Sequence, residues 1–426
     1  MHNFDQRPEA KGSPLRVEGR IANHDREFEG AIEINTDTGL IEYVGPITGK
    51  SDIDLAGQIV FPGFGDLHIH AREDSSQLQT YKEDFATASA ASIHGGVTYV
   101  ADMPNNAKAP IDDESYTEKE TLTAKSAVHV TLYAGIGPAT NPLARHVPYK
   151  VFMGPSVGDL YFASQAQLES VIERYRGKSV SFHCEDPVIL GESKAAPTHE
   201  QRRPASAEIA ATAFALYLIE KYELIGKLCH YSTKVGLEMI AAAKARGVRV
   251  TAEAAPHHLF FDDTMLTDEN RKWLQANPPL RAREDRLALI TALREGLVDY
   301  LATDHAPHTN EEKMNGMSGM PHLDTYGAFA TWLMAKHGFS AKDIARVCAY
   351  NPGSFVNEFL PDGFGKGYGV IEPGYVGSLT ILNLDAPLVV RREELKTKCG
   401  WSPFEGYTMP GRVTYTVLKG KVYRAG

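Results

Sequence analysis

Six side chains that can bind metal ions are scattered over more than half of the chain. They are four histidines, one lysine and one aspartate: His68, His70, His183, His230, Lys150 and Asp304. The densest group is His68-Ile69-His70, at the end of an apolar run. Because successive residues of a strand point to opposite faces, His68 and His70 share a face and can bind one cation. The set predicts a two-metal site.

Lys150 is the unusual member of this set. A lysine cation among metal ligands would repel the metals, so Lys150 either points away or is chemically changed. Reaction of its neutral amine with carbon dioxide gives a carbamate, whose two oxygens could each bind one cation. The carbamate, the Asp304 carboxylate and a bridging hydroxide would then offset most of the charge of two divalent cations. Such a centre suits polarisation of a carbonyl group and activation of water.

The composition describes an ordinary globular protein that carries an excess of acidic residues. The chain has 426 residues, of which 43% are hydrophobic and 23% are charged, and its formal net charge is -10. An acidic surface does not attract nucleic acid or an anionic membrane, so neither is expected as a partner. A small anionic substrate would instead need a local cationic site.

The cysteines and the N-terminal residues indicate a cytoplasmic protein. The four cysteines are scattered and form no C-x-x-C pair, which favours a reducing compartment over a disulfide framework: Cys184, Cys229, Cys348 and Cys399. The first residues lack the apolar core of a signal peptide, and no stretch approaches the roughly 20 apolar residues of a membrane span.

Hydrophobic periodicity predicts an α/β fold with one large barrel. From residue 61 to 364, buried-strand runs alternate with helical patterns such as 205–222 and 235–246, which is typical of a (β/α)8 TIM-like barrel. Residues 1–60 and 365–426 contain short alternating runs and are expected to form one small β-sandwich domain. The predicted metal ligands fall at or just beyond the C-terminal ends of predicted strands, including 180–183, 228–230 and 300–304. Barrels of this type carry out their chemistry at that end.

Each ligand also has a structural interpretation. A lone histidine at a strand end is more often a hydrogen-bonded structural residue than a metal ligand, and the chain has 16 histidines. For His183 or His230 alone, the structural role is favoured. The combination of both with His-x-His and with Asp304-His305-Ala306-Pro307-His308 makes coincidence a poor explanation, although an inactive descendant that kept the motifs would look the same.

Several short motifs cover nearly the whole chain: Gly65 to Arg72, Lys82-Glu83-Asp84-Phe85, Met103-Pro104-Asn105, Lys150-Val151-Phe152, His183-Cys184-Glu185, Cys229-His230, Ala255-Pro256-His257-His258-Leu259, Asn277-Pro278-Pro279-Leu280-Arg281, Ala302 to Thr309 and Trp401-Ser402-Pro403-Phe404-Glu405-Gly406. His-x-His alone marks only the amidohydrolase superfamily. Together with the following arginine, Met-Pro-Asn and Asp-His-Ala-Pro-His, it narrows the resemblance to dihydroorotases. The chain is similar to the dihydroorotase domain of the animal multifunctional pyrimidine-synthesis protein.

The resemblance implies a binuclear zinc centre. His68, His70 and Asp304 would hold one Zn²⁺ ion, and His183 and His230 would hold the second. Lys150, carrying a carbamate derived from carbon dioxide, would bridge the two ions. Asp304 would also be the catalytic general acid and base.

The resemblance also implies a substrate and a reaction. The reaction is the reversible cyclisation of N-carbamoyl-L-aspartate to L-dihydroorotate in pyrimidine biosynthesis. Arg72, Asn105 and His308 would bind the α-carboxylate of the substrate, and a guanidinium fork matches a carboxylate well. Asn277 either orients the substrate ring through its amide or caps a turn.

Other residues near the motifs have less defined roles. Many relatives have Pro-Gly after the Arg-Glu pair, whereas here Arg72-Glu73 leads into Asp74-Ser75-Ser76, so that loop is expected to differ. Ser156 falls where the animal domain has a mobile loop, and it is either a hydrogen-bond donor to substrate or part of a plain turn. His257 and His258 are adjacent and are expected in hydrogen-bonded supporting roles. Cys184 and Glu185 either support the ligand His183 or bind an additional metal.

Two other functions remain as alternatives. A hydantoinase or allantoinase would use the same metals on an uncharged ring, but these relatives generally lack an arginine at the position of Arg72. A catalytically silent scaffold for other pyrimidine enzymes would tend to lose metal ligands, and none of the six is lost here. The sequence leaves open a homodimer or an association with aspartate transcarbamoylase.

Overall fold

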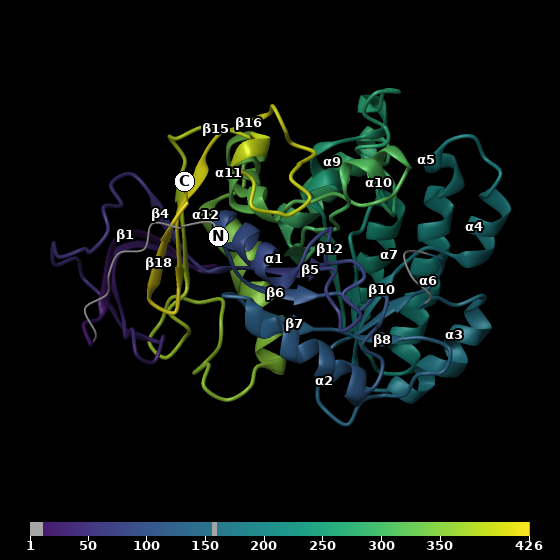
Figure 1. Cartoon of the computed structure of the whole chain (residues 1–426), viewed down its shortest axis with the longest axis horizontal. Helices are drawn as coiled ribbons and strands as arrows, with labels where there is room; N and C mark the ends of the chain where they lie inside the picture. The colour runs from purple at the N-terminus through teal and green to yellow at the C-terminus, as the bar shows by residue number, and fades with distance from the viewer. Residues whose placement is uncertain (1–11, 156–159, 426) are drawn as a thin grey trace.

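The computed structural model describes residues 12–155 and 160–425. Parallel strands and helices alternate through its central part (Figure 1). The strands of this part are β5 (Phe64–Ile69), β6 (Val97–Asp102), β7 (His129–Leu132), β8 (Ala134–Ile136), β9 (Tyr149–Phe152), β10 (Ser179–His183), β11 (Ile225–Leu228), β12 (Val250–Ala254) and β13 (Tyr300–Leu301). Only Tyr133 separates β7 from β8, so these two segments form one bent strand that joins β5-β6-β7 to the β8–β13 sheet.

The sheet closes on itself between β5 and the segment after β13. The backbone N–H of His70 donates to the carbonyl of His305 over 2.8 Å, and the N–H of His305 donates to the carbonyl of His68 over 3.2 Å. A parallel bridge pairs Ile69 with His305. Closure with parallel strands and intervening helices confirms the predicted (β/α)8 barrel.

Helices surround the barrel strands. The longer ones are α1 (Phe85–His94), α2 (Asp113–Leu122), α3 (Gln165–Ile172), α6 (Ala205–Lys221), α7 (Lys234–Ala245), α9 (Arg283–Glu295) and α11 (Tyr326–His337). The shorter ones are α4 (Pro187–Ser193), α5 (His199–Arg202), α8 (Pro256–Phe260), α10 (Asn310–Met314), α12 (Ala341–Ala345) and α13 (Asn351–Val356). The predicted helices at 205–222 and 235–246 are α6 and α7.

The two ends of the chain share one sheet, as predicted. Its strands are β1 (Leu15–Ala22), β2 (Glu27–Ile34), β3 (Ile41–Gly45), β4 (Ile59–Pro62), β14 (Leu379–Asn383), β17 (Arg412–Leu418) and β18 (Lys421–Arg424), in the order β18-β17-β14-β4-β1-β2-β3. The short strands β15 (Leu388–Val389) and β16 (Thr408–Met409) pair separately. Figure 1 shows the purple and yellow strands side by side at one end of the barrel.

The core of this small domain takes apolar side chains from both ends of the chain. Val17, Ile32 and Val60 pack in one cluster with Ile381 and Val417, all of them fully buried. Burial of this surface holds head and tail together. The domain limits at residues 60 and 364 stay a prediction.

Two predicted strands are shorter than expected. Strand β11 ends at Leu228 and β13 ends at Leu301, whereas extended structure was predicted as far as His230 and Asp304. The backbone φ is +34° at His230 and +48° at Asp304, and such values are incompatible with a strand. The prediction was wrong there because both residues lie in irregular segments at the barrel mouth, where unusual backbone geometry is common.

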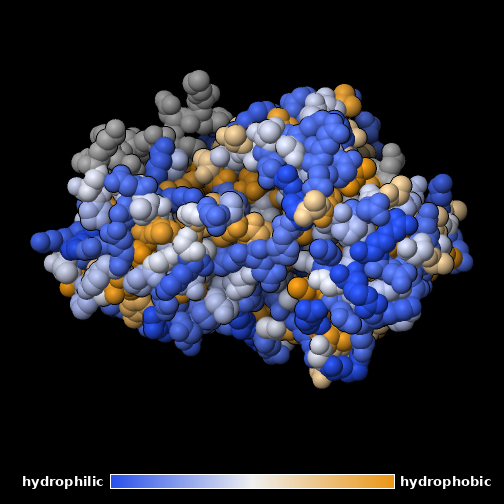
Figure 2. All heavy atoms as spheres, turned by 90° about the horizontal axis from the view of Figure 1, so that it is seen from below, coloured by the Kyte–Doolittle hydropathy of each residue, from blue (hydrophilic) through white to orange (hydrophobic). Residues whose placement is uncertain are grey.

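Hydrophilic residues cover most of the face seen in Figure 2, with hydrophobic residues in separate groups between them. None of the helices in the described ranges combines the length and the apolar character that a membrane crossing requires.

Candidate metal centre and anion site

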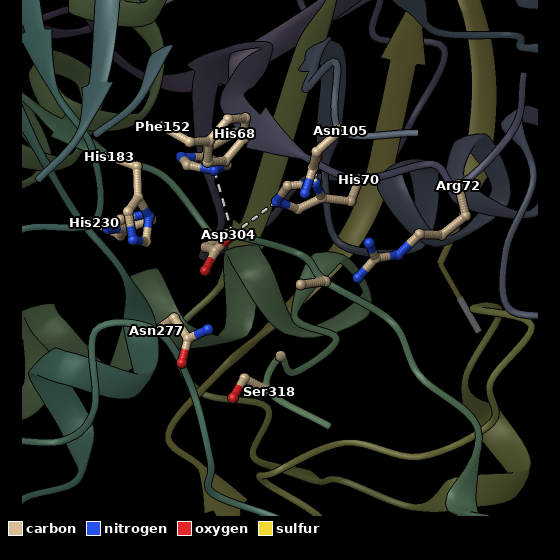
Figure 3. A pocket seen from close by; sticks show the side chains of 12 residues that line it. His68, His70, Arg72, Asn105, Phe152, His183, His230, Asn277, Asp304 and Ser318 are labelled. Atoms are coloured by element: carbon tan, nitrogen blue, oxygen red, sulfur yellow. Dashed lines mark hydrogen bonds and ion pairs between the residues drawn. The ribbon is translucent and has the colours of Figure 1, made fainter. Parts of the chain in front are cut away.

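Three predicted ligands meet at one oxygen atom at the barrel mouth. His68 belongs to β5, His70 follows it directly, and Asp304 follows β13. The Oδ1 atom of Asp304 lies 3.3 Å from Nε2 of His68 and 3.1 Å from Nε2 of His70. Figure 3 shows both rings directed at the carboxylate. The three groups are spaced closely enough to hold one metal ion.

The other two histidines form a second group beside the first. Nδ1 of His183, at the end of β10, lies 2.9 Å from Nε2 of His230, beyond β11. The ring centroids of His230 and His68 are 5.1 Å apart, so the two groups adjoin. The structure therefore brings together all five non-lysine ligands that the sequence predicted.

Lys150 lies within electrostatic reach of both groups. It belongs to β9, is fully buried, and has its Nζ atom 2.9 Å from Sγ of Cys229. Among the described residues, no carboxylate forms an ion pair with it. A buried ammonium group without a counter-charge is costly, which fits an amine that is chemically changed in the working protein.

Electrostatics at the site favour neutral histidines. Burial, together with the positive charge of Lys150, lowers the pKa of His68, His70, His183 and His230 below the ordinary value. Burial also raises the pKa of Asp304 to about 7, although Lys150 and His183 oppose this. Neutral imidazoles and a carboxylate are the forms that bind metal ions. The donor set fits a metal centre.

Hydrogen bonds fix the orientation of the ligand rings. Nδ1 of His68 lies 2.8 Å from Glu253, and Nδ1 of His70 lies 2.7 Å from Oδ1 of Asn105. These contacts leave the Nε2 atoms for the metal. Sequence reasoning missed Glu253, which ends a buried strand run and which also forms an ion pair with the buried Lys227.

Arg72 provides a cationic group in the same cavity. The cavity is lined by both histidine groups and also by Arg72, Asn105 and Asn277. Arg72 is 2% exposed and donates from Nε to the carbonyl of Pro307 over 3.3 Å. Nη2 of Arg72 lies 3.2 Å from Nε2 of His308. His308 is not among the residues that line the cavity and contacts Arg72 from behind.

Asn277 faces the metal ligands across the cavity (Figure 3). Its Oδ1 atom is buried and has no hydrogen-bond partner within the described residues. Nε2 of His258 donates to the carbonyl of Pro278 over 2.9 Å and so supports the Asn277 loop. His257 contacts His322 over 3.1 Å.

The two residues after His183 differ in their roles. Glu185 lies 2.7 Å from Nε2 of His183 and forms an ion pair with Arg203. Although burial opposes it, these partners hold the pKa of Glu185 below its ordinary value. Cys184 is buried, and its thiol donates to the Phe182 carbonyl over 3.9 Å. Ser156 lies outside the described residues.

Comparison with known proteins places this site in a family. Residues 59–147 and 151–423 match the amidohydrolase family. The chain belongs to that family, whose members are metal-dependent, and the resemblance seen in the sequence is confirmed. Within the family, it is 32% identical over 411 residues to a dihydroorotase of Pyrococcus horikoshii, covering 96% of this chain and 91% of that protein. It is 33% identical over 402 residues to a dihydroorotase of Lactobacillus acidophilus, covering 89% and 92%.

Solved structures support the fold. An L-hydantoinase from Arthrobacter aurescens superposes with a TM-score of 0.85 at 24% identity, covering 96% of both chains. A D-hydantoinase from a Thermus species superposes with a TM-score of 0.80 at 22% identity, covering 96% of this chain and 95% of that chain. These similarities indicate the barrel with its small β domain.

The contact between Glu253 and His68 predicts an effect on metal affinity. Replacing Glu253 by Gln removes the charge that holds the His68 ring, so we expect metal affinity to fall roughly 10- to 100-fold. Metal titration after chelation would measure this change. The matched control is Glu238→Gln at an exposed position of α7, and an equal affinity in both variants would contradict the role of Glu253.

Proposed function

We propose that this protein is a dihydroorotase, which interconverts N-carbamoyl-L-aspartate and L-dihydroorotate in pyrimidine biosynthesis. Relatives of that name align with nearly the whole chain. The observation that carries the proposal is the buried guanidinium group of Arg72 in the same cavity as the metal ligands. It offers a charged partner for the α-carboxylate, which both the open and the cyclic substrate carry.

The same observation disfavours an uncharged substrate. A hydantoin or allantoin ring has no carboxylate, so Arg72 would stay buried without an anion in reach of its free N–H groups. The Nε atom of Arg72 donates to the Pro307 carbonyl, and one hydrogen of Nη2 is directed at His308. The hydrogens that remain on Nη1 and Nη2 can donate two hydrogen bonds to a carboxylate. Asn105 accepts at Oδ1 and keeps its amide N–H groups for the same anion. His308 completes this group through its contact with Arg72.

The metal ligands divide into the two groups described above. We propose that His68, His70 and Asp304 hold one zinc ion, that His183 and His230 hold the other, and that a carbamate on Lys150 joins them. Zinc, when bound, polarises a carbonyl group and lowers the pKa of water. The lowered pKa values of the buried histidines, and the lack of an ion pair at Lys150 within the described residues, support this assignment.

Asp304 is the proposed proton carrier. In cyclisation the carbamoyl nitrogen attacks the β-carboxylate carbon, a C–N bond forms and a C–O bond breaks. The departing oxygen leaves as water after taking up two protons, one from the nitrogen and one from solvent. Asp304 accepts the proton that the nitrogen loses and returns it to the departing oxygen. In hydrolysis it delivers a proton to the ring nitrogen. A buried carboxyl with its pKa near 7 is suited to exchange protons at neutral pH.

The remaining proposals concern substrate orientation and location. Asn277 lines the cavity and would orient the substrate ring through its amide group. All four cysteines are free thiols, which supports a reducing, cytoplasmic location. A homodimer or an association with aspartate transcarbamoylase stays a prediction from the sequence.

Carboxylation of Lys150 can be observed directly. Protein supplied with zinc and ¹³C-bicarbonate should show a carbamate carbon signal, since the buried amine needs a negative group to sit beside cations. Lys150→Met should lose the signal and the activity, and the exposed variant Lys336→Met should keep both. An active wild-type enzyme with no such signal would refute the modification.

Asp304→Asn should reduce kcat by roughly 10²- to 10⁴-fold, because an amide cannot carry the proton. Steady-state rates on dihydroorotate would measure this loss, with circular dichroism and metal content as checks on the fold and the centre. Asp268→Asn, at an exposed position, should behave as the wild type. Near-normal turnover by Asp304→Asn would rule out the acid/base role.

Arg72→Met should distinguish the charged substrate from an uncharged one. Loss of a charge-assisted bidentate contact should lower kcat/KM for dihydroorotate by at least about 10-fold, with a much smaller effect on an uncharged cyclic imide such as dihydrouracil. The control is Arg391→Met on the surface. Equal losses on both substrates would remove the argument for carboxylate recognition.

A further inference from the structure

A cluster of charged side chains lies behind Arg72, outside the cavity lining. Glu312, in the first turn of α10, accepts four contacts at its two carboxylate oxygens. Lys82 lies 2.8 Å and the hydroxyl of Tyr81 lies 2.6 Å from Oε1. The backbone N–H of Thr309 lies 3.1 Å and Nδ1 of His308 lies 3.2 Å from Oε2.

The partners of His308 determine which ring nitrogen carries the proton. Nε2 faces Nη2 of Arg72 at 3.2 Å, and a guanidinium group can only donate, so Nε2 must accept. A neutral ring then carries its proton on Nδ1. Glu312 is the acceptor that this N–H requires. Burial and the charges of Arg72 and Lys82 lower the pKa of His308, which agrees with a neutral ring.

We infer that Glu312 is a positioning residue for the substrate carboxylate. It fixes the tautomer and the orientation of His308, which in turn holds the Arg72 guanidinium toward the cavity. This inference rests on the proposed function, because it assigns Glu312 to recognition of the α-carboxylate in that same site.

The contacts of Glu312 exceed what helix capping needs. In a capping box one carboxylate oxygen accepts the backbone N–H of the N-cap residue, here Thr309. The contacts of Lys82, Tyr81 and His308 are additional. Lys82 is 4% exposed and its Nζ atom also lies 3.5 Å from Nδ1 of His308, so it needs the negative charge of Glu312 nearby.

The hydrogen bonds of Arg72 set the orientation of its guanidinium group. Its Nε atom is bound to the Pro307 carbonyl and one Nη2 hydrogen is directed to His308, so the guanidinium plane is fixed at two points. Arg72 also lines the cavity, and Figure 3 shows its side chain directed inward. If the His308 ring turns or changes tautomer, the contact between Arg72 and His308 is lost. The guanidinium group is then no longer oriented to donate two hydrogen bonds to a carboxylate.

Glu312→Gln tests the inference, because the amide oxygen can still cap the helix while the charge and one acceptor are removed. We expect KM for dihydroorotate to rise about tenfold while kcat stays within about twofold, since a charge-assisted contact in the binding group is weakened. Kinetics on dihydrouracil should be unchanged. The matched control is Glu311→Gln, which makes the same change at the exposed neighbouring position of α10.

The outcomes separate the two proposals. A wild-type enzyme that does not turn over dihydroorotate refutes the proposed function. If the wild type is active, two results for Glu312→Gln refute the positioning role alone. One is an unchanged KM for dihydroorotate, and the other is an equal loss on dihydroorotate and dihydrouracil.

A second measurement uses the wild-type protein and does not depend on how the variant folds. Nitrogen-15 NMR of the labelled histidine rings, with His308 identified by the signals lost in His308→Gln, should show its proton on Nδ1. A proton on Nε2 would overturn the inference.

Discussion

The short backbone ladder that closes the barrel is the interaction on which the rest of the site depends. Two hydrogen bonds join His68 and His70 to His305, a residue far along the chain. They fix Asp304 against the two histidine rings, because its side chain turns inward from a backbone with φ of +48°. Without this closure the end of β5 and the segment after β13 would not be held side by side, and the donor atoms of His68, His70 and Asp304 would not converge. The geometry of the centre is therefore a property of the closed sheet.

Around this centre the protein buries four cationic side chains together with several carboxylates. Arg72, Lys82, Lys150 and Lys227 are each less than 5% exposed. Lys227 and Lys82 are balanced by Glu253 and Glu312, which also hold His68 and His308 in place. Each carboxylate thus serves two purposes, since it neutralises a buried ammonium group and orients an imidazole ring. Within residues 12–155 and 160–425, no carboxylate forms an ion pair with Arg72 or Lys150, and these are the two cations for which we propose groups that arrive from outside.

The barrel, and the meeting of the five predicted histidine and aspartate side chains at its mouth, could be predicted from the sequence, because strand ends and His-x-His spacing depend on local periodicity. The roles of Glu253 and Lys82 could not, because their partners are set by tertiary packing that no spacing reveals. Glu312 is an intermediate case: Thr309-x-x-Glu312 indicates a capping box, but nothing in that motif shows that the carboxylate also reaches His308. The ends of β11 and β13 were predicted too long because positive φ at His230 and Asp304 has no signal in residue type. Non-glycine residues adopt such angles when surrounding structure imposes them.

The order of strands in the small sheet has a consequence for synthesis of the chain on the ribosome. Strand β4 lies between β1 and β14, and β14 is followed across the sheet by β17. All barrel strands precede β14 in the chain, so the nascent β4 carries an unpaired edge while the barrel is being made. At ordinary elongation rates this interval lasts about 15 to 60 s. An open edge of Ile59–Pro62 is then free to pair with other strands, so this interval is when the growing protein is most exposed to aggregation.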